Sequence, residues 1–243
     1  MRKSIAAAGL LAASFTTSAC SHERSEDPGP VVQRNFQVGN FTEVEVAGPF
    51  DVDIRTGGNP GVSARGNRAL IDRLEVEVRG NKLVIHPKSE HRWFGGWHST
   101  VGKGSISVTV PMIQAATLAG SGDLSVDNVR GDRFDGKIAG SGGLKLGTVE
   151  VGTLKLGIAG SGGATAGQGK AQQAEYEIAG SGNVDAQTIQ VDTLKVSIAG
   201  AGDVKAHASG TADVSIMGAG DVTVTGGAKC NAHKMGSGNV NCS

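Results

Sequence analysis

The chain has 243 residues, a formal net charge of zero and 39 glycines, but only six phenylalanines, two tryptophans and one tyrosine. A balanced charge offers no basic surface to a phosphate backbone, so we predict no nucleic-acid partner. Abundant glycine with few aromatic residues favours thin stacked layers over a thick globular core.

The first 19 residues have the organisation of an export signal. Arg2 and Lys3 provide the positive start, and a mainly apolar run follows over residues 5–15. This run is too short for a transmembrane helix, which needs about 20 apolar residues. We therefore predict that residues 1–19 are a signal peptide.

The end of this signal, Thr17-Ser18-Ala19-Cys20, resembles a bacterial lipobox with threonine where leucine is usual. We predict lipid attachment at Cys20 as the only membrane contact, with simple signal cleavage as the alternative. Ser21 resembles the pattern of lipoproteins sent to the outer membrane, so the expected location is the outer membrane of a bacterial cell envelope. The alternative is a soluble periplasmic or secreted protein. Residues 20–35 are polar and contain prolines, which is typical of a flexible tether.

Residues 36–117 alternate apolar and polar positions without a clean repeat. We expect an irregular start of one domain that spans residues 36–243. The predicted elements are strands at 44–46 and 52–54 around Gly48-Pro49-Phe50-Asp51, a helical turn at 70–74, strands at 74–78 and 83–85 around Gly80-Asn81, and a strand at 106–110.

One insertion in this segment contains both tryptophans and, with His86 just before it, three of the six histidines. We predict a recognition loop, which contacts a ligand or another protomer, at His91, Trp93, Phe94, Trp97 and His98. Two alternatives stay open. The aromatic side chains of a packing loop would cover the flank of the domain, or the three histidines would bind a metal as neutral imidazoles.

A glycine triplet recurs along residues 118–243 at spacings of 20, 20, 20, 20, 18 and 18 residues. The first glycines of the triplets are Gly120, Gly140, Gly160, Gly180, Gly200, Gly218 and Gly236. A fixed period of this size is the signature of a solenoid, in which one coil cannot bury its apolar face alone. An acyltransferase-type left-handed helix has 18-residue coils, which fit only the last two spacings.

Apolar residues alternate with polar ones on both sides of each triplet. One apolar column, before the triplet, is Leu118, Ile138, Ile158, Ile178, Ile198 and Ile216. A period of two predicts two short strands joined by a tight Gly-x-Gly arch, and it excludes helix. We therefore predict an all-β, right-handed parallel β-helix whose coils stack about 4.8 Å apart.

A charged column supports the same stacking. Five residues before the triplets the chain reads Asp135, Lys155, Glu175, Lys195 and Asp213. Opposite charges on neighbouring strands attract, so alternating signs favour this register over a slip by one coil.

Apart from Cys20 the chain has two cysteines, and both flank the last triplet. Because exported proteins fold in an oxidising compartment, we predict a disulfide between Cys230 and Cys242. It would staple the final coil, which has no further coil to pack against.

The segment from Val44 to Ile54, the Leu-Val-Ile at 83–85 and the serial Ala-Gly-Ser-Gly units together resemble the head GIN domain family of auto-transporter adhesins. The similarity covers about residues 38–242. It implies a right-handed parallel β-helix similar in shape to pectin lyases, an envelope location and a role in adhesion, without recognised catalytic residues. The chain departs from a complete autotransporter, so we expect anchoring through Cys20 or a partner.

We predict a non-enzymatic envelope protein that acts in adhesion, binding or as a scaffold, without a cofactor. Its partner would be an envelope protein or a glycan, and homo-oligomerisation is left open. One alternative is a polysaccharide-active enzyme that uses outward carboxylates such as Glu175 and Glu177. Another is calcium binding by Asp203 and Asp221 on adjacent coils, although these side chains can instead bond to backbone amides of their turns.

Overall fold

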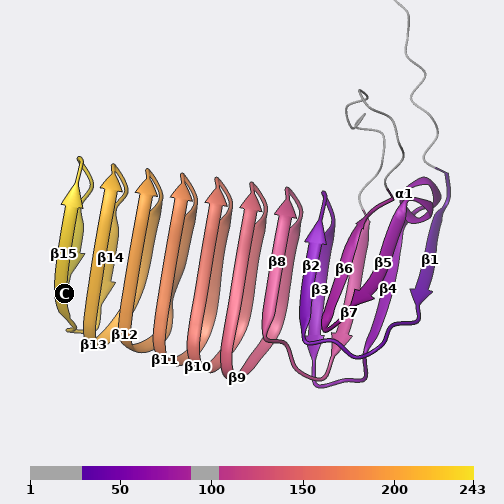
Figure 1. Ribbon diagram of the computed structural model, residues 1–243, viewed down its shortest axis with the longest axis horizontal. Helices are drawn as coiled ribbons and strands as arrows, with labels where there is room; N and C mark the ends of the chain where they lie inside the picture. The colour runs from indigo at the N-terminus through magenta and orange to yellow at the C-terminus, as the bar shows by residue number, and fades with distance from the viewer. Residues whose placement is uncertain (1–28, 89–103) are drawn as a thin grey trace, which may run out of the picture.

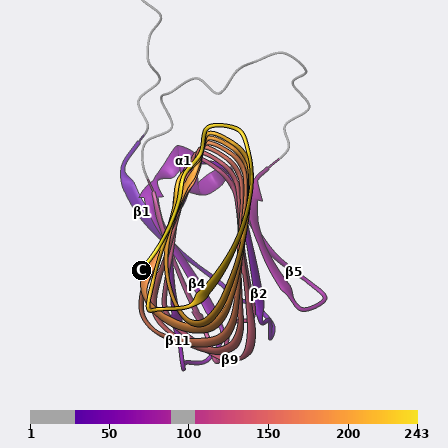
Figure 2. The ribbon, with the colours of Figure 1, turned by 90° about the vertical axis from the view of Figure 1, so that its left-hand side faces the viewer.

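The computed structural model describes residues 29–88 and 104–243, and Figure 1 shows them as a row of stacked coils. Within these ranges the structure is almost entirely β, with one short helix, α1 (Arg68–Asp72). The predicted all-β solenoid is confirmed. Seen along the stack, the coils superimpose as one flattened closed loop (Figure 2).

Five long strands form the regular coils, and each bends once so that it contributes to both faces of the loop. Their bounds are β9 (Asp123–Gly140), β10 (Gly143–Gly160), β11 (Gly163–Gly180), β12 (Asn183–Gly200) and β13 (Asp203–Gly218). All pair in parallel with the next coil, so that Leu144 lies between Leu124 and Ala164. The strands β9 to β12 follow one another residue for residue, and β13 follows β12 apart from register shifts between Ala186 and Thr193, so equivalent side chains stack in columns.

The core lies inside the loop and is filled by the alternating apolar residues. The isoleucine column before the triplets is buried throughout, with Ile138, Ile158, Ile178, Ile198 and Ile216 each at most 3% exposed. Successive side chains of a strand point to opposite sides, so the polar residues between them face solvent.

The two faces continue into the irregular first half. On one face β2 (Glu43–Ala47) pairs with β8 (Ala115–Gly120) and with β6 (Lys82–Pro87). On the other face β3 (Asp51–Thr56) pairs with β9 and with β7 (Ser105–Val110). The arch at Gly48-Pro49-Phe50, between two strands that the sequence predicts, therefore stacks against the first glycine triplet.

Antiparallel strands and α1 close this end of the core. β5 (Leu74–Arg79) forms a hairpin with β6, while β4 (Gly61–Asn67) joins β7 to β1 (Val31–Phe36). Leu70 and Ile71 of α1 are buried against the core. β1 begins inside the range 20–35 that we predicted as a tether, because residues 31–35 pair with β4.

The C-terminal end consists of three short strands: β14 (Val222–Thr225) and β15 (Lys229–Met235) stack on β13, and β16 (Val240–Cys242) stacks on β14. Every residue of β15 is exposed, since no further coil packs on it. Among the described strands β15 pairs only with β13, and β16 pairs only with β14, so both are edge strands.

The glycine arches nest directly on one another. Gly160 has φ of 130°, and the amides of Ser161 and Gly162 donate hydrogen bonds of 2.9 and 3.0 Å to the carbonyl of Gly140. A Cβ added at Gly160 would lie well inside van der Waals contact of that same carbonyl oxygen. Both the positive φ and the close approach therefore require glycine at this position.

We expect Gly160→Ala to destabilise the fold by about 2 kcal/mol or more, because strain at a positive φ adds to the clash with Gly140. Ser161→Ala is the matched control, since Ser161 is exposed and Ala201 and Ala219 occupy the equivalent position in later coils. Urea unfolding followed by circular dichroism measures both. Equal stability of the two variants would contradict the steric account of the arches.

Tyr176 of β11 is the one tyrosine of the chain, and its side chain is completely buried. The other inward positions of this coil are mostly alanine, at Ala164, Ala166, Ala171 and Ala174, which leaves room for the ring. The phenol oxygen has no hydrogen-bond partner among the described residues. Burial therefore raises the pKa of Tyr176, and the hydroxyl carries a desolvation cost without a compensating bond.

We expect Tyr176→Phe to stabilise the protein by about 1 kcal/mol, because the ring keeps its packing and the unsatisfied hydroxyl is removed. The thermal midpoint and the urea midpoint should both rise. A loss of stability would show instead that the hydroxyl is satisfied, for example by an internal water.

Candidate functional site

The predicted lipid site Cys20 and the predicted recognition loop lie outside the described residues. Cys20 lies in residues 1–28 and the predicted loop in residues 89–103, and the residues that flank these two ranges lie beside α1. Lys88 bonds to the carbonyls of Arg73 and Asp72 through its amide (2.7 Å) and its ammonium group (2.9 Å), and the carbonyl of Pro30 accepts the amide of Arg68 at 3.0 Å. Residues 1–28 and 89–103 therefore both join the described structure at its α1 end.

The two C-terminal cysteines form the predicted disulfide. Cys230 of β15 and Cys242 of β16 are bonded at 2.04 Å, with their Cα atoms 6.5 Å apart. The bond links the edge strands β15 and β16 across the last glycine arch, so it holds the end of the solenoid together.

The aspartates after the triplets accept backbone hydrogen bonds from the next coil. Oδ1 of Asp203 accepts the amide of Asp221 at 3.0 Å, and Oδ1 of Asp221 accepts the amide of Asn239 at 2.9 Å. Asp51 and Asp123 accept the amides of Asp123 and Gly143 in the same way. These carboxylates stabilise the stacking through charge-assisted bonds, which accounts for the column without calcium.

The alternating charges stack as the sequence predicts. Glu175 lies between Lys155 and Lys195 on the neighbouring coils, and its carboxylate contacts both ammonium groups, that of Lys195 at 2.9 Å. These contacts, with Lys155 first, lower the pKa of Glu175. A carboxylate held ionised between two lysines is unsuited to general acid catalysis.

We expect Glu175→Lys to lower the urea midpoint, because three lysines would then stand in one column of neighbouring strands. Glu177→Lys makes the same change of charge beside Gly157 and Ser197, which are neutral. The midpoint of this control should therefore move less, and the difference between the variants should shrink in high salt. A larger loss in the control would contradict the register.

A surface depression with a volume of about 370 Å³ lies on the face that contains β3, opposite the face of Glu175. It is lined mainly by polar and small residues that include Asp53, Arg55, Ser125, Asp127, Lys145 and Gly147. Asp127 accepts the amide (2.9 Å) and the hydroxyl (3.0 Å) of Thr56, and Asp53 accepts the hydroxyl of Ser125. Its carboxylates are thus already engaged in hydrogen bonds that join neighbouring strands.

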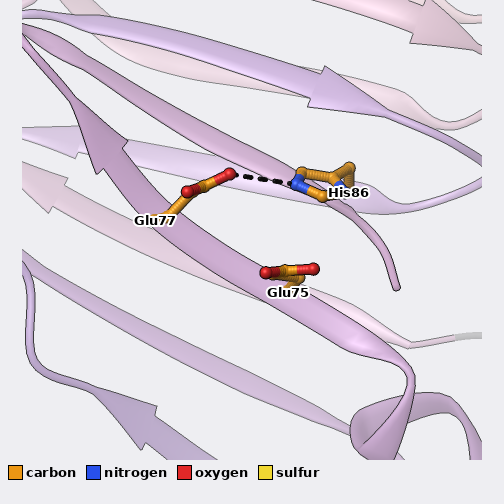
Figure 3. Close-up of side chains that lie close together, drawn as sticks. All are labelled: Glu75, Glu77 and His86. Atoms are coloured by element: carbon orange, nitrogen blue, oxygen red, sulfur yellow. Dashed lines mark hydrogen bonds and ion pairs between the residues drawn. The ribbon is translucent and has the colours of Figure 1, made fainter. Parts of the chain in front are cut away.

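A different cluster lies on the outer face of the β5–β6 hairpin (Figure 3). Glu75 and Glu77 alternate with apolar residues along β5, so both point outward, and Glu75 pairs directly opposite His86 of β6. Ligand-type atoms of Glu75, Glu77 and His86 all lie within 4.8 Å of one another. All three residues are partly buried.

Both ring nitrogens of His86 face hydrogen-bond acceptors, so the two bonds together favour the doubly protonated ring. Nδ1 lies 2.9 Å from the carbonyl oxygen of Pro87, which can only accept, so Nδ1 carries a hydrogen. Nε2 lies 3.2 Å from Oε1 of Glu77 (Figure 3). The bond to Pro87 raises the pKa of His86; partial burial opposes this shift and Glu77 reinforces it.

The two carboxylates of the cluster differ in their partners. Oε1 of Glu77 contacts both His86 and Nη2 of Arg79, the latter at 2.5 Å, and these contacts lower the pKa of Glu77. Among the described residues Glu75 makes no side-chain hydrogen bond or ion pair. The carboxylate of Glu75 therefore lies beside that of Glu77 without an ion pair of its own in the described part of the chain.

Sequence reasoning missed this cluster. It placed His86 with the insertion and searched for carboxylates nearby in sequence only. The available signal was the hairpin itself, because pairing around Gly80-Asn81 puts residue 75 opposite residue 86.

Within the described ranges no helix is long and apolar enough to cross a bilayer.

Comparison with known families gives one match. Residues 40–228 match the family described as "Putative auto-transporter adhesin, head GIN domain". A comparison with curated proteins returns no match.

Several solved structures share the fold. A "putative adhesin" of Bacteroides fragilis aligns with a TM-score of 0.79 and 19% identity over 88% of this chain and 97% of that one. A "putative lipid binding protein" of Parabacteroides distasonis gives 0.69 and 24%, and a "putative adhesin" of Parabacteroides merdae gives 0.70 and 16%, each over 88% and 97% of the two chains. At these identities the likeness shows the fold alone.

Proposed function

Because the chain belongs to the head GIN domain family, we propose that it is a non-enzymatic binding protein of the bacterial cell envelope that acts in adhesion. The observation that carries this proposal is the family match over residues 40–228. The solenoid adds two long flat faces, which are suited to contacts with an extended partner.

The outer surface of these faces supports a binding role. Close to the arches, one face exposes a column of alanines, at Ala139, Ala159, Ala179 and Ala199, that ends in Met217 and Met235. The two methionines are 62% and 70% exposed. Short side chains let a partner approach the sheet closely, and exposed methionines adapt to varied surfaces.

The carboxylates on the regular coils support the non-enzymatic reading. Glu175 is held between two lysines, and the aspartates after the arches accept backbone amides. Catalysis by carboxylates needs a pair whose pKa values are pushed apart around a substrate, with one poised as an acid.

We propose lipid attachment at Cys20 and an outer-membrane location as the anchoring arrangement. Because residues 1–28 join the structure beside α1, an anchor at Cys20 tethers that end of the solenoid. The last coil then lies farthest along the rod from the tether. Metabolic labelling with a fatty-acid analogue tests this, and label that persists in Cys20→Ser would contradict it.

The partner we propose is a glycan or an envelope protein, contacted through the loop that contains Trp93 and Trp97. The test uses residues 21–243 and a Trp93→Ala/Trp97→Ala variant on a glycan array and on immobilised outer-membrane fractions. We expect saturable binding to a defined ligand that the variant loses while its thermal midpoint stays unchanged. Glu177→Gln, on a regular coil, serves as the control that retains binding.

Binding that the double variant retains would overturn the role of the loop and point to the sheet faces. Cleavage of an oligosaccharide that is lost in Glu175→Gln would overturn the non-enzymatic reading. No binding by either form to glycans or membrane fractions would contradict adhesion itself.

A further inference from the structure

We propose that Glu75, Glu77 and His86 form a binding site for Zn²⁺ on the β5–β6 hairpin. The proposal rests on the geometry of this cluster and goes beyond the proposed adhesive function. It commits to zinc because the three side chains offer one imidazole and two carboxylates, which is a ligand set that zinc accepts.

The orientation of His86 is suited to binding a metal. A metal-binding histidine usually donates its second ring N–H to a carbonyl or a carboxylate, which fixes the tautomer and aims the other nitrogen at the metal. His86 has this arrangement, since Nδ1 is bonded to the carbonyl of Pro87, outside the cluster. Nε2 is then left facing Oε1 of Glu77, and zinc would take the place of the proton between these two atoms (Figure 3).

The spacing of the ligand atoms also fits zinc. With bonds of about 2.0–2.2 Å, two ligands of a tetrahedral zinc lie about 3.3 Å apart. Nε2 of His86 and Oε1 of Glu77 are separated by 3.2 Å. The remaining ligand atoms of the cluster lie within 4.8 Å, a gap that rotation of one glutamate side chain closes.

The carboxylate of Glu75 is available as a third ligand. Glu75 has no other partner among the described residues, so it can rotate toward the metal without breaking a bond. Arg79 contacts Glu77 and is 66% exposed, so it can remain as an outer partner of a bound carboxylate. Three protein ligands leave one position of a tetrahedral zinc for water.

The ligand set disfavours hard cations. Calcium takes six to eight oxygen ligands, and magnesium requires an octahedron of oxygens with several waters. A cluster that offers one nitrogen and few oxygens from a two-stranded hairpin fits neither requirement. We therefore expect selectivity for zinc over both alkaline-earth ions.

The test uses residues 21–243, purified without a polyhistidine tag and freed of metal by a chelator. Isothermal titration with ZnCl₂ should give one binding event near one equivalent, and the thermal midpoint should rise with zinc but stay unchanged with CaCl₂ or MgCl₂. His86→Ala and Glu75→Gln should each weaken this binding at least about tenfold, because each removes a ligand.

Two controls separate this site from other zinc ligands of the chain. His233→Ala removes an exposed histidine of β15, and His91→Ala/His98→Ala removes two histidines outside the described residues. Both controls should bind zinc as the unchanged chain does, and circular dichroism should show the same fold in all variants.

Zinc binding that survives in His86→Ala but disappears in His91→Ala/His98→Ala would overturn the site. Absence of any zinc-dependent heat or midpoint shift in the unchanged chain would overturn it as well. A midpoint shift with calcium as large as that with zinc would overturn the choice of metal.

Discussion

The close contact between successive glycine arches is the constraint on which the rest of the structure depends. Each arch donates amide hydrogen bonds to the first glycine carbonyl of the arch before it, as Ser161 and Gly162 do to Gly140. A side chain at Gly160 would occupy the space of that carbonyl. Because the arches cannot separate or slide past one another, they define the spacing and the register of both faces along the whole row of coils.

On the regular coils the outward side chains meet neighbours 18 or 20 residues away in sequence, apart from the register shifts between β12 and β13. Glu175 consequently meets Lys155 and Lys195, and Asp221 meets the backbone of Asn239. On the regular coils these carboxylates therefore stabilise the stacking, although the same residue types in a cleft would suggest catalysis. Outside the regular coils a carboxylate can lack such a stacking partner, as Glu75 does.

The period of the glycines predicted the coils, and alternation predicted which side chains face inward. Neither pattern reports how side chains of one coil share the core volume, so the compensation of Tyr176 by four alanines was not predicted. The cluster of Glu75 with His86 was predictable, because the turn at Gly80-Asn81 implies their pairing. The pairing of residues 31–36 with β4 was not, since these two strands are separated by more than 20 residues of irregular sequence.

The two ends of the solenoid solve the problem of an unpaired coil differently. At the last coil a covalent bond between Cys230 and Cys242 takes the place of packing, and β15 stays exposed. At the other end α1 buries Leu70 and Ile71, and antiparallel strands extend both faces. The residues that flank segments 1–28 and 89–103 lie at this α1 end, and so does the cluster of Glu75, Glu77 and His86. The candidate sites outside the repeats therefore lie at one end of the solenoid. The number of repeats determines the distance from this end to the disulfide between Cys230 and Cys242.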